Sequence, residues 1–346
     1  MPIHKICNEF GVEIETIKNP EKRIPRLSHF RTTDDGSLSY GGVEFVSEKI
    51  DFSDKLKVKE FKKEIKKIAK ISDVDVSCGL HIHLNCPISN LMKRQKLKKL
   101  ILGYRLFEPI IFSMVSKSRR NNRFARKLST WEAFRDLNNF VRSDFYEILG
   151  KYFGYRLEEE PKGEKRLIVK TNLGHQHKGQ FYRYLYLNLQ SIFCHGSIEI
   201  RLHQGTIDIE KIWNWLLLHK KFILHLLGMN ISDIIKLYEK EGQEAFWKIV
   251  KNKKLEKYYK ERIKGFGKVR DCSKNVNLEI FNAYLKKEGV KRENLEEAEK
   301  KDADEFNLQR CAFCQIAIAE EQSNFCSANC ENLFAEHQIE IENESE

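Results

Sequence analysis

Three separated segments of the chain alternate apolar and polar residues at every second position. They cover residues 11–15, 79–84 and 197–203. Strand side chains point alternately to the two faces, so each segment predicts a strand with one buried face of Val, Ile and Leu. The other face carries glutamates in the first segment, histidines in the second, and Glu, Arg and His in the third. If these strands are neighbours, one sheet face gathers carboxylates, imidazoles and a guanidinium.

The remaining pattern predicts a fold that mixes strands with helices. Strands are expected over residues 7–17, 28–33, 43–47, 79–85, 165–170, 182–190 and 196–203. Helical spacing of apolar residues predicts helices over residues 54–70, 90–116, 130–151 and 208–227, then an all-helical stretch over 232–300 interrupted near 264–268 and 289. Because strands often follow one another without an intervening helix, the class is α+β.

Changes in composition divide the chain into four predicted parts. They are an α+β domain over residues 1–228, a helical extension over 229–304, a cysteine-rich module over 305–338 and an acidic, disordered tail over 339–346. No run of about 18 apolar residues occurs and the N-terminus has no signal core, so neither a membrane span nor secretion is expected. Nine cysteines without a disulfide-like pattern suit a reducing compartment, and we expect a cytoplasmic protein.

A net charge of +11, mostly from lysine, favours anionic partners without identifying one. The lysine-rich helices near residues 55–70 and 93–99 are interpreted first as solvated faces, and second as phosphate contacts. Residues 117–127 differ, because arginines are dense there. This patch predicts anion binding at the functional site.

The acidic strand face is the first sign of a metal site. Glu9, Gly11, Glu13 and Glu15 share that face, and carboxylates without a counter-charge repel one another unless a cation lies between them. His81 and His83 alone would more often be ordinary core or surface residues, but with the carboxylates they favour metal binding. Carboxylates with an imidazole suit Mg²⁺ or Mn²⁺ better than structural zinc.

Five separated blocks, in consistent order over about residues 7–220, resemble the amidoligase family. They are Gly11-Val12-Glu13-Ile14-Glu15 with Asp35-Gly36-Ser37-Leu38 and Glu44-Phe45-Val46-Ser47; Cys78-Gly79-Leu80-His81-Ile82-His83-Leu84; Ser118-Arg119-Arg120-Asn121-Asn122; Arg183-Tyr184 with Leu187-Asn188-Leu189; and residues 198–206. The resemblance implies a glutamine-synthetase-like carboxylate–amine ligase that consumes ATP. It also implies a curved antiparallel sheet whose concave face holds divalent metals, ATP and substrate.

The resemblance also implies roles for particular residues. The implied ligands of Mg²⁺ or Mn²⁺ are Glu13, Glu15, Glu44, His81, His83 and Glu199. Arg119 and Arg201 are expected to meet phosphate or the substrate carboxylate. The other residues expected to bind ATP are Arg120, Arg183 and Asn188, and the expected catalytic residues are Glu13, Glu199, Arg119 and Arg201.

Chemistry supports such a reaction independently. A carboxylate is a poor electrophile, and phosphorylation by ATP gives an acyl phosphate with a good leaving group. Phosphoryl transfer needs metals that bridge phosphates and cationic donors for the developing charge, a role that suits arginine. No Gly-x-x-x-x-Gly-Lys-Ser/Thr segment occurs, so a P-loop is not expected.

The cysteine-rich module predicts a second metal. Cys311, Cys314, Cys326 and Cys330 form two close pairs that can close a tetrahedral structural zinc site, and the segment resembles small treble-clef-like zinc fingers. His337 is expected on a helix surface. The module could dock on protein or on nucleic acid, and its acidic surroundings favour protein.

The leading hypothesis is therefore an ATP- and metal-dependent ligase that joins a carboxylate to an amine, either of which could belong to a peptide or protein. A rival is a non-catalytic basic scaffold whose zinc finger binds nucleic acid or a protein partner. A third is a metal-dependent hydrolase using the same carboxylates and histidines. A requirement for ATP distinguishes the first from the third.

Overall fold

The computed structural model describes residues 6–33, 38, 41–86, 94–130, 155–159, 165–169, 184–269 and 286. Several predictions lie outside these residues and stay predictions. They concern the helix over 130–151, Arg183, the helices beyond 269, the four cysteines of the zinc module and the acidic tail.

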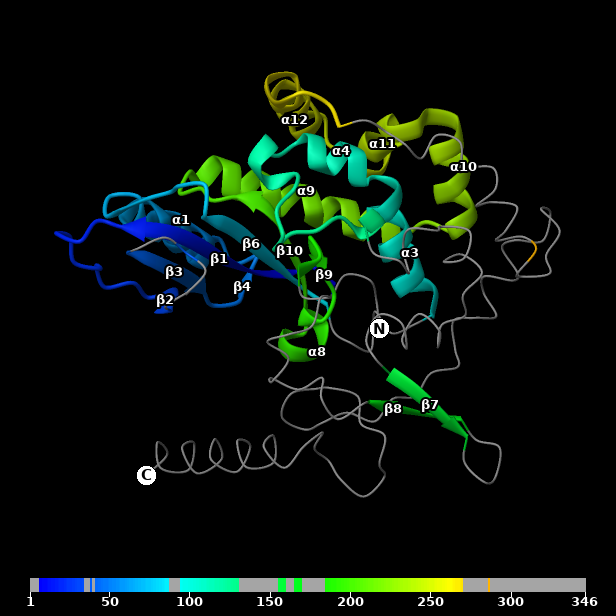
Figure 1. Ribbon diagram of the computed structural model, residues 1–346, viewed down its shortest axis with the longest axis horizontal. Coiled ribbons are helices and arrows are strands. Elements are labelled where there is room, and N and C mark those ends of the chain that lie inside the picture. The colour runs from blue at the N-terminus through cyan, green and yellow to red at the C-terminus, as the bar shows by residue number, and fades with distance from the viewer. Residues whose placement is uncertain are drawn as a thin grey trace.

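The centre of the molecule is an open, eight-stranded antiparallel sheet (Figure 1). Its main strands lie in the order β2 (Phe30–Thr33), β3 (Gly42–Ser47), β1 (Glu9–Lys18), β6 (Gly79–Asn85), β10 (Ser197–Gln204) and β9 (Leu187–Asn188). Two short strands, β4 (Ile50–Asp51) and β5 (Ser72–Asp73), also pair with β1. A separate two-stranded sheet joins β7 (Tyr155–Glu159) to β8 (Lys165–Val169). The predicted mixture of antiparallel strands and helices is confirmed.

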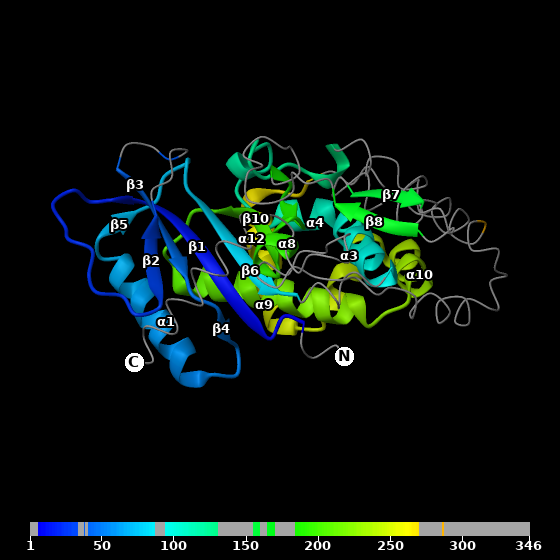
Figure 2. The ribbon, with the colours of Figure 1, turned by 90° about the horizontal axis from the view of Figure 1, so that it is seen from below.

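Helices cover one face of the main sheet (Figures 1 and 2). They include α1 (Lys55–Ile68), α3 (Arg94–Leu106), α4 (Glu108–Ser113), α9 (Ile209–Leu227), α10 (Ile231–Glu241), α11 (Ala245–Val250) and α12 (Lys253–Phe266). The short helix α8 (Ser191–His195) lies on the other face, where Ser191 Oγ is 3.3 Å from His83 Nδ1. Phe61 of α1 and Trp213 of α9 both pack on Phe10 of β1, with ring centroids 5.1 and 5.8 Å away. Among the described residues, no helix combines the length and apolarity needed to cross a bilayer.

Local sequence explains where these helices begin and end. Asp208 caps α9 by accepting hydrogen bonds from two backbone N–H groups, as the predicted helix start requires. The single helix expected over 90–116 is wrong, because the helix breaks at Phe107 and a new helix, α4, begins at Glu108 with Pro109 in its first turn. The stretch after 232 also breaks earlier than predicted, where Gly242 and Lys251 adopt φ angles of 58° and 51°. Within the described part of the strand expected over 182–190, residues 184–190, the strand is only two residues long.

One apolar core runs from the sheet into α10–α12. The ring centroids of Phe107 and Tyr238 lie 5.4 Å apart, and those of Phe222 and Phe246 lie 4.7 Å apart. Trp215 of α9, fully buried, reaches Tyr259 of α12 at 6.1 Å. Burial of each such side chain contributes roughly 1.5–3 kcal/mol, so the later helices strengthen the support beneath the sheet.

A β-bulge in β10 changes one predicted side-chain direction. The pairing of β10 with β6 shifts register between Ile200 and His203. An extra residue in one strand reverses the alternation that follows it. His203 therefore packs on the helix side, with its ring centroid 5.1 Å from that of Trp215, and does not share a face with Glu199 and Arg201 as the alternation predicted.

Candidate active site

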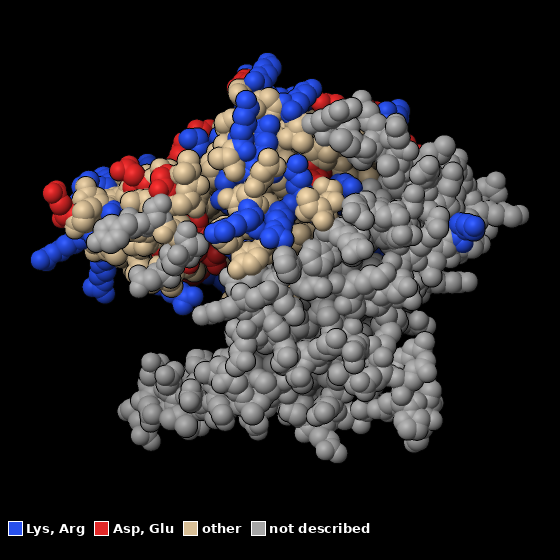
Figure 3. Space-filling model, in the orientation of Figure 1, with Lys and Arg blue, Asp and Glu red and all other residues tan. Residues whose placement is uncertain are grey.

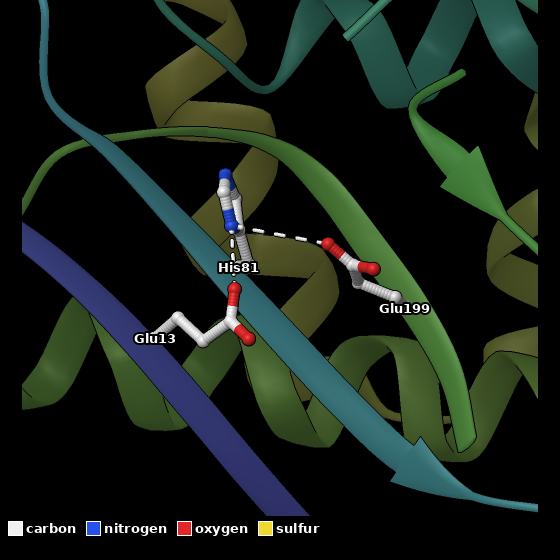
Figure 4. A group of neighbouring side chains, drawn as sticks. All are labelled: Glu13, His81 and Glu199. Carbon is white, nitrogen blue, oxygen red and sulfur yellow. Dashed lines mark hydrogen bonds and ion pairs between the residues drawn. The ribbon is translucent and has the colours of Figure 1, made fainter. Parts of the chain in front are cut away.

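Strand register brings the charged segments of the sequence together on the open face of the sheet. Glu13 lies opposite His81, Glu15 opposite Glu44, and His83 opposite Glu199. The expected convergence of distant segments is thus confirmed. Figure 4 shows Glu13, His81 and Glu199 projecting toward one another from β1, β6 and β10.

His81 is the centre of this group. Its Nδ1 lies 2.9 Å from Glu13 Oε2 and 3.8 Å from Glu199 Oε1, and its Nε2 lies 3.4 Å from Glu15 Oε1. Only 4% of the imidazole is exposed. One ring therefore faces carboxylates on both of its nitrogen sides, although a neutral imidazole can donate from only one nitrogen.

Two overlapping sets of side chains have the spacing of a cation site. They are Glu13, His81 and Glu199, and Glu15, Glu44 and His81, each with donor atoms within 4.8 Å of one another. Mg²⁺ holds its ligands at about 2.1 Å, so opposite ligands lie roughly 4.2 Å apart. Small side-chain movements would close either set around an ion. Both the donor chemistry and the spacing fit Mg²⁺ or Mn²⁺.

The electrostatics of the group is unbalanced. Burial alone would raise the pKa of Glu13, but His83 and His81 hold that pKa well below its usual value. Burial raises the pKa of Glu44, and the charge of Glu13 raises it further, despite a 2.8 Å hydrogen bond from Thr33. A carboxylate that resists ionisation beside ionised neighbours indicates that negative charge is in excess, a state that a bound cation would relieve.

Two arginines, the buried Arg119 and the partly buried Arg201, border the carboxylates. Arg201 donates to Glu199, and Arg119 donates from Nη2 to the carbonyl oxygen of Arg201 at 3.0 Å. Although burial lowers the pKa of Arg201, Glu199 raises it above the ordinary value. A guanidinium stays protonated in proteins, so both groups are positive charges beside the candidate cation sites.

Gly79 makes this close packing sterically feasible. A Cβ at that position would lie 3.0 Å from Arg119 Nη2, 3.1 Å from Glu15 Oε2 and 3.3 Å from His81 Nε2. The backbone N–H of Gly79 also donates to Glu15. No role was predicted for Gly79 from the sequence, although a glycine within a strand can signal a close approach.

Other predicted site residues divide into neighbours of the group and residues apart from it. Asn188 donates from Nδ2 to Glu199 Oε2 at 2.7 Å. His83 lies 3.2 Å from Glu13 through Nε2, and its Nδ1 lies 3.0 Å from Ser197 Oγ, a contact that the sequence did not suggest. The guanidinium of Arg120 instead donates to backbone carbonyls of residues 113, 115 and 267, at the end of α12. Arginine and lysine side chains gather near α4 and α12 in Figure 3.

A cavity of 470 Å³ adjoins the group and shares Glu13 and His83 with it. Its wall also includes Gly11, Arg31 and Lys49. Both cations are exposed and, within the described part of the chain, neither makes an ion pair. The cavity thus offers free positive charge close to the carboxylates.

The chain is therefore an α+β protein built on an open antiparallel sheet. One face of this sheet carries carboxylates and imidazoles and is flanked by arginines. The chain belongs to the family whose model is described as "putative amidoligase enzyme", which it matches over residues 25–223. That description indicates an amide-forming ligase, a class of enzyme that acts on a carboxylate and an amine. A comparison with curated proteins gave no match. Glu13 and Glu15 precede the matched range, and strand pairing connects them to Glu44 and His81 within it.

Proposed function

We propose that the protein is an ATP-dependent carboxylate–amine ligase that works through an acyl phosphate, with chemistry like that of glutamine synthetase. The observation that carries this proposal is the convergence of Glu13, Glu15, Glu44, His81 and Glu199 from four strands onto one face. Such a concentration of buried carboxylates costs stability, and a site for divalent cations gives it a use.

The reaction has two balanced steps. A carboxylate oxygen of the substrate takes the γ-phosphoryl group of ATP, and ADP leaves. The amine nitrogen then attacks the acyl carbon, inorganic phosphate leaves, and the amine loses a proton. Mg²⁺ or Mn²⁺ would neutralise the phosphate charge during the first step.

The chain's own residues have distinct roles in this proposal. Either carboxylate and imidazole set centred on His81 would hold a divalent cation, and His83 supports Glu13. Arg119 and Arg201 stabilise charge on the transferred phosphoryl group. Asn188 orients Glu199 through its 2.7 Å hydrogen bond. Arg31 and Lys49 in the cavity attract the substrate carboxylate. Arg120, which bonds to backbone carbonyls elsewhere, supports the loop that carries Arg119.

The proposal also includes a zinc module, a further ATP-binding residue and a cellular compartment. Cys311, Cys314, Cys326 and Cys330 bind a structural zinc ion in a small finger that docks on protein. Arg183 binds ATP. The reaction takes place in the cytoplasm, where the buried thiols of Cys7, Cys78 and Cys86 would stay reduced.

The test of the proposed function is ATP turnover by the full chain, measured with mixed amino acids as carboxylate and amine substrates. Phosphate release should require Mg²⁺ or Mn²⁺, and Glu13→Gln and Glu199→Gln should each lower it at least a hundredfold with an unchanged circular dichroism spectrum. Glu210→Gln, on α9, is the matched control and should be neutral. Full turnover in both site variants would refute the assignment.

A second candidate is hydrolysis without ATP. It is favoured by Ser197, whose Oγ lies 3.0 Å from His83 Nδ1, while the other nitrogen of His83 faces Glu13. A serine, imidazole and carboxylate in series resemble an activated nucleophile. Turnover of an ester or amide substrate without ATP, lost in Ser197→Ala, would support this candidate over the ligase.

A further inference from the structure

A groove of 500 Å³ runs along the solvent side of α1, away from the candidate active site. Five lysines line it: Lys55, Lys59, Lys62, Lys63 and Lys66. Phe52 and Val58 form its apolar floor. The inner side of α1, with Phe61 and Ile65, packs on the helix-covered face of the sheet, so groove and site lie on different sides of the molecule.

The lysine groove has no counter-charge of its own. Within the described part of the chain, none of its five lysines makes an ion pair. The two glutamates of α1 are used elsewhere: Glu60 contacts His29, and Glu64 accepts the backbone N–H groups of Ser28 and His29. Like charges three or four residues apart destabilise a helix by a few tenths of a kcal/mol per pair. A bound anion would remove that cost.

The ring of Phe52 in the groove and the ring of Trp213 beside it are unsuited to stacking on nucleic-acid bases. Lys62 Nζ lies 3.9 Å above the ring of Trp213, and Lys220 Nζ lies 3.7 Å above the ring of Phe52. Base stacking on open aromatic faces supplies much of the affinity for single strands. Because lysines already occupy these faces, the groove favours carboxylates over bases.

The sequence contains an anionic segment with matching periodicity. Glutamate stands at every second position in Glu340, Glu342, Glu344 and Glu346. In an extended segment these four carboxylates would share one side and span roughly 20 Å. Lys55, Lys59, Lys62 and Lys66 follow one helical stripe of roughly 16 Å. The two charge rows therefore correspond in number and approximate length.

We propose that the lysine groove on α1 binds the chain's own acidic segment, residues 339–346. Attachment within one chain gives a high effective concentration, so several weak ion pairs are enough to hold the segment. Val58, in the floor of the groove, accepts the methylene groups of the glutamates. Other polyanions would compete with this contact.

Zero-length carbodiimide cross-linking of the full chain tests this proposal without using turnover, so its outcome is separate from that of the proposed function. The reagent activates a carboxylate, a lysine amine attacks it, and an amide forms as the urea leaves. In the monomer fraction, mass spectrometry should find lysines 55–66 joined to glutamates 340–346. The double variant K59E/K66E should lower that yield about tenfold, and so should high salt.

Two variants make the result specific. K236E/K240E reverses two exposed lysines on α10 and should leave the cross-links unchanged. Adding E342K/E344K to K59E/K66E should restore them with reversed polarity. The proposal is overturned if the wild-type monomer gives no such cross-links, or if the α10 control lowers them equally. It is also overturned if an unstructured RNA oligonucleotide occupies the groove while the acidic segment stays unlinked.

Discussion

The two faces of the sheet hold histidine in opposite states. On the open face, burial by itself would lower the pKa of His83, but Glu13 and Glu199 raise it above the ordinary value. On the helix-covered face, burial and the charge of Arg262 lower the pKa of His203 to about 3. Burial likewise lowers the pKa of His219 to about 3. The interior thus uses neutral imidazoles as packing groups, whereas the open face keeps charges in contact.

The helix-covered face contributes to stability, whereas the acidic face carries the candidate site. His203 and His219 enclose Trp215, with ring centroids 5.1 and 4.2 Å from it, and add apolar contact to the core. Glu15 and Glu44 are like charges directly opposite each other on neighbouring strands, an arrangement that costs stability. Arrangements that cost stability, such as like charges on neighbouring strands, occur most often at functional sites. We therefore expect mutations on the two faces to have different consequences.

The largest expected effect is a loss of stability caused by a substitution on the helix-covered face of the sheet. Trp215→Ala should lower the free energy of unfolding by about 4 kcal/mol, because it removes a fully buried indole and leaves a cavity among His203, His219 and Tyr259. Urea unfolding followed by circular dichroism measures this change. A loss below about 1 kcal/mol would mean that this face does not carry the stability of the domain.

Loss of cation affinity, with the fold retained, should follow from a change at Gly79. Gly79→Ala places a methyl group against Arg119, Glu15 and His81 and should weaken Mn²⁺ binding roughly tenfold. Gly265→Ala is the control, since a Cβ there meets no atom within 4 Å. Isothermal titration calorimetry with Mn²⁺ compares the two. Equal affinities would show that the packing around Gly79 does not shape the site.

The fold should become more stable when a carboxylate charge is removed from the open face of the sheet. Glu44→Gln removes the like-charge pair with Glu15 and should raise the free energy of unfolding by up to about 1 kcal/mol at pH 7 without metal. The raised pKa of Glu44, due to burial and Glu13, means that ionisation opposes folding. The wild-type penalty should thus disappear as the pH falls below that pKa. A destabilised variant at pH 7 would contradict this account of the acidic face.

The smallest expected effect is the contribution of His29 to the pH dependence of stability. Although burial lowers the pKa of His29, hydrogen bonds to Glu60 and Glu48 raise it overall. Its charged form therefore stabilises the fold below the unfolded pKa of about 6.5, and this contribution is lost as the pH rises through the folded pKa. His29→Gln should cost more stability at pH 6 than at pH 8 in thermal unfolding. The reverse order would show that His29 folds as a neutral residue.

Sequence periodicity predicted the features that depend on local alternation. It predicted strands at Glu13 and Glu15, at His81, and at Glu199, and their convergence followed because each strand had one charged face. A five-block resemblance predicted the family. Neither depends on details of tertiary packing.

Features that depend on tertiary packing could not be predicted in the same way. The bulge that turns His203 inward arises from the pairing of β10 with β6. The role of Gly79 depends on side chains from β1 and from the segment around Arg119. Arg120 and Arg119 are adjacent in sequence, yet their guanidinium groups bond to different parts of the molecule. Such directions are set by the three-dimensional contacts and not by the spacing of residue types.

The most direct measurement of the central claim is an anomalous-scattering map of crystals of the full chain soaked with Mn²⁺. The account predicts a peak among Glu13, His81 and Glu199, or among Glu15, Glu44 and His81, and no such peak in Glu13→Gln/Glu44→Gln crystals. Saturating Mn²⁺ that gives no peak at either set, while His81 keeps its direct contacts with the carboxylates, would contradict it.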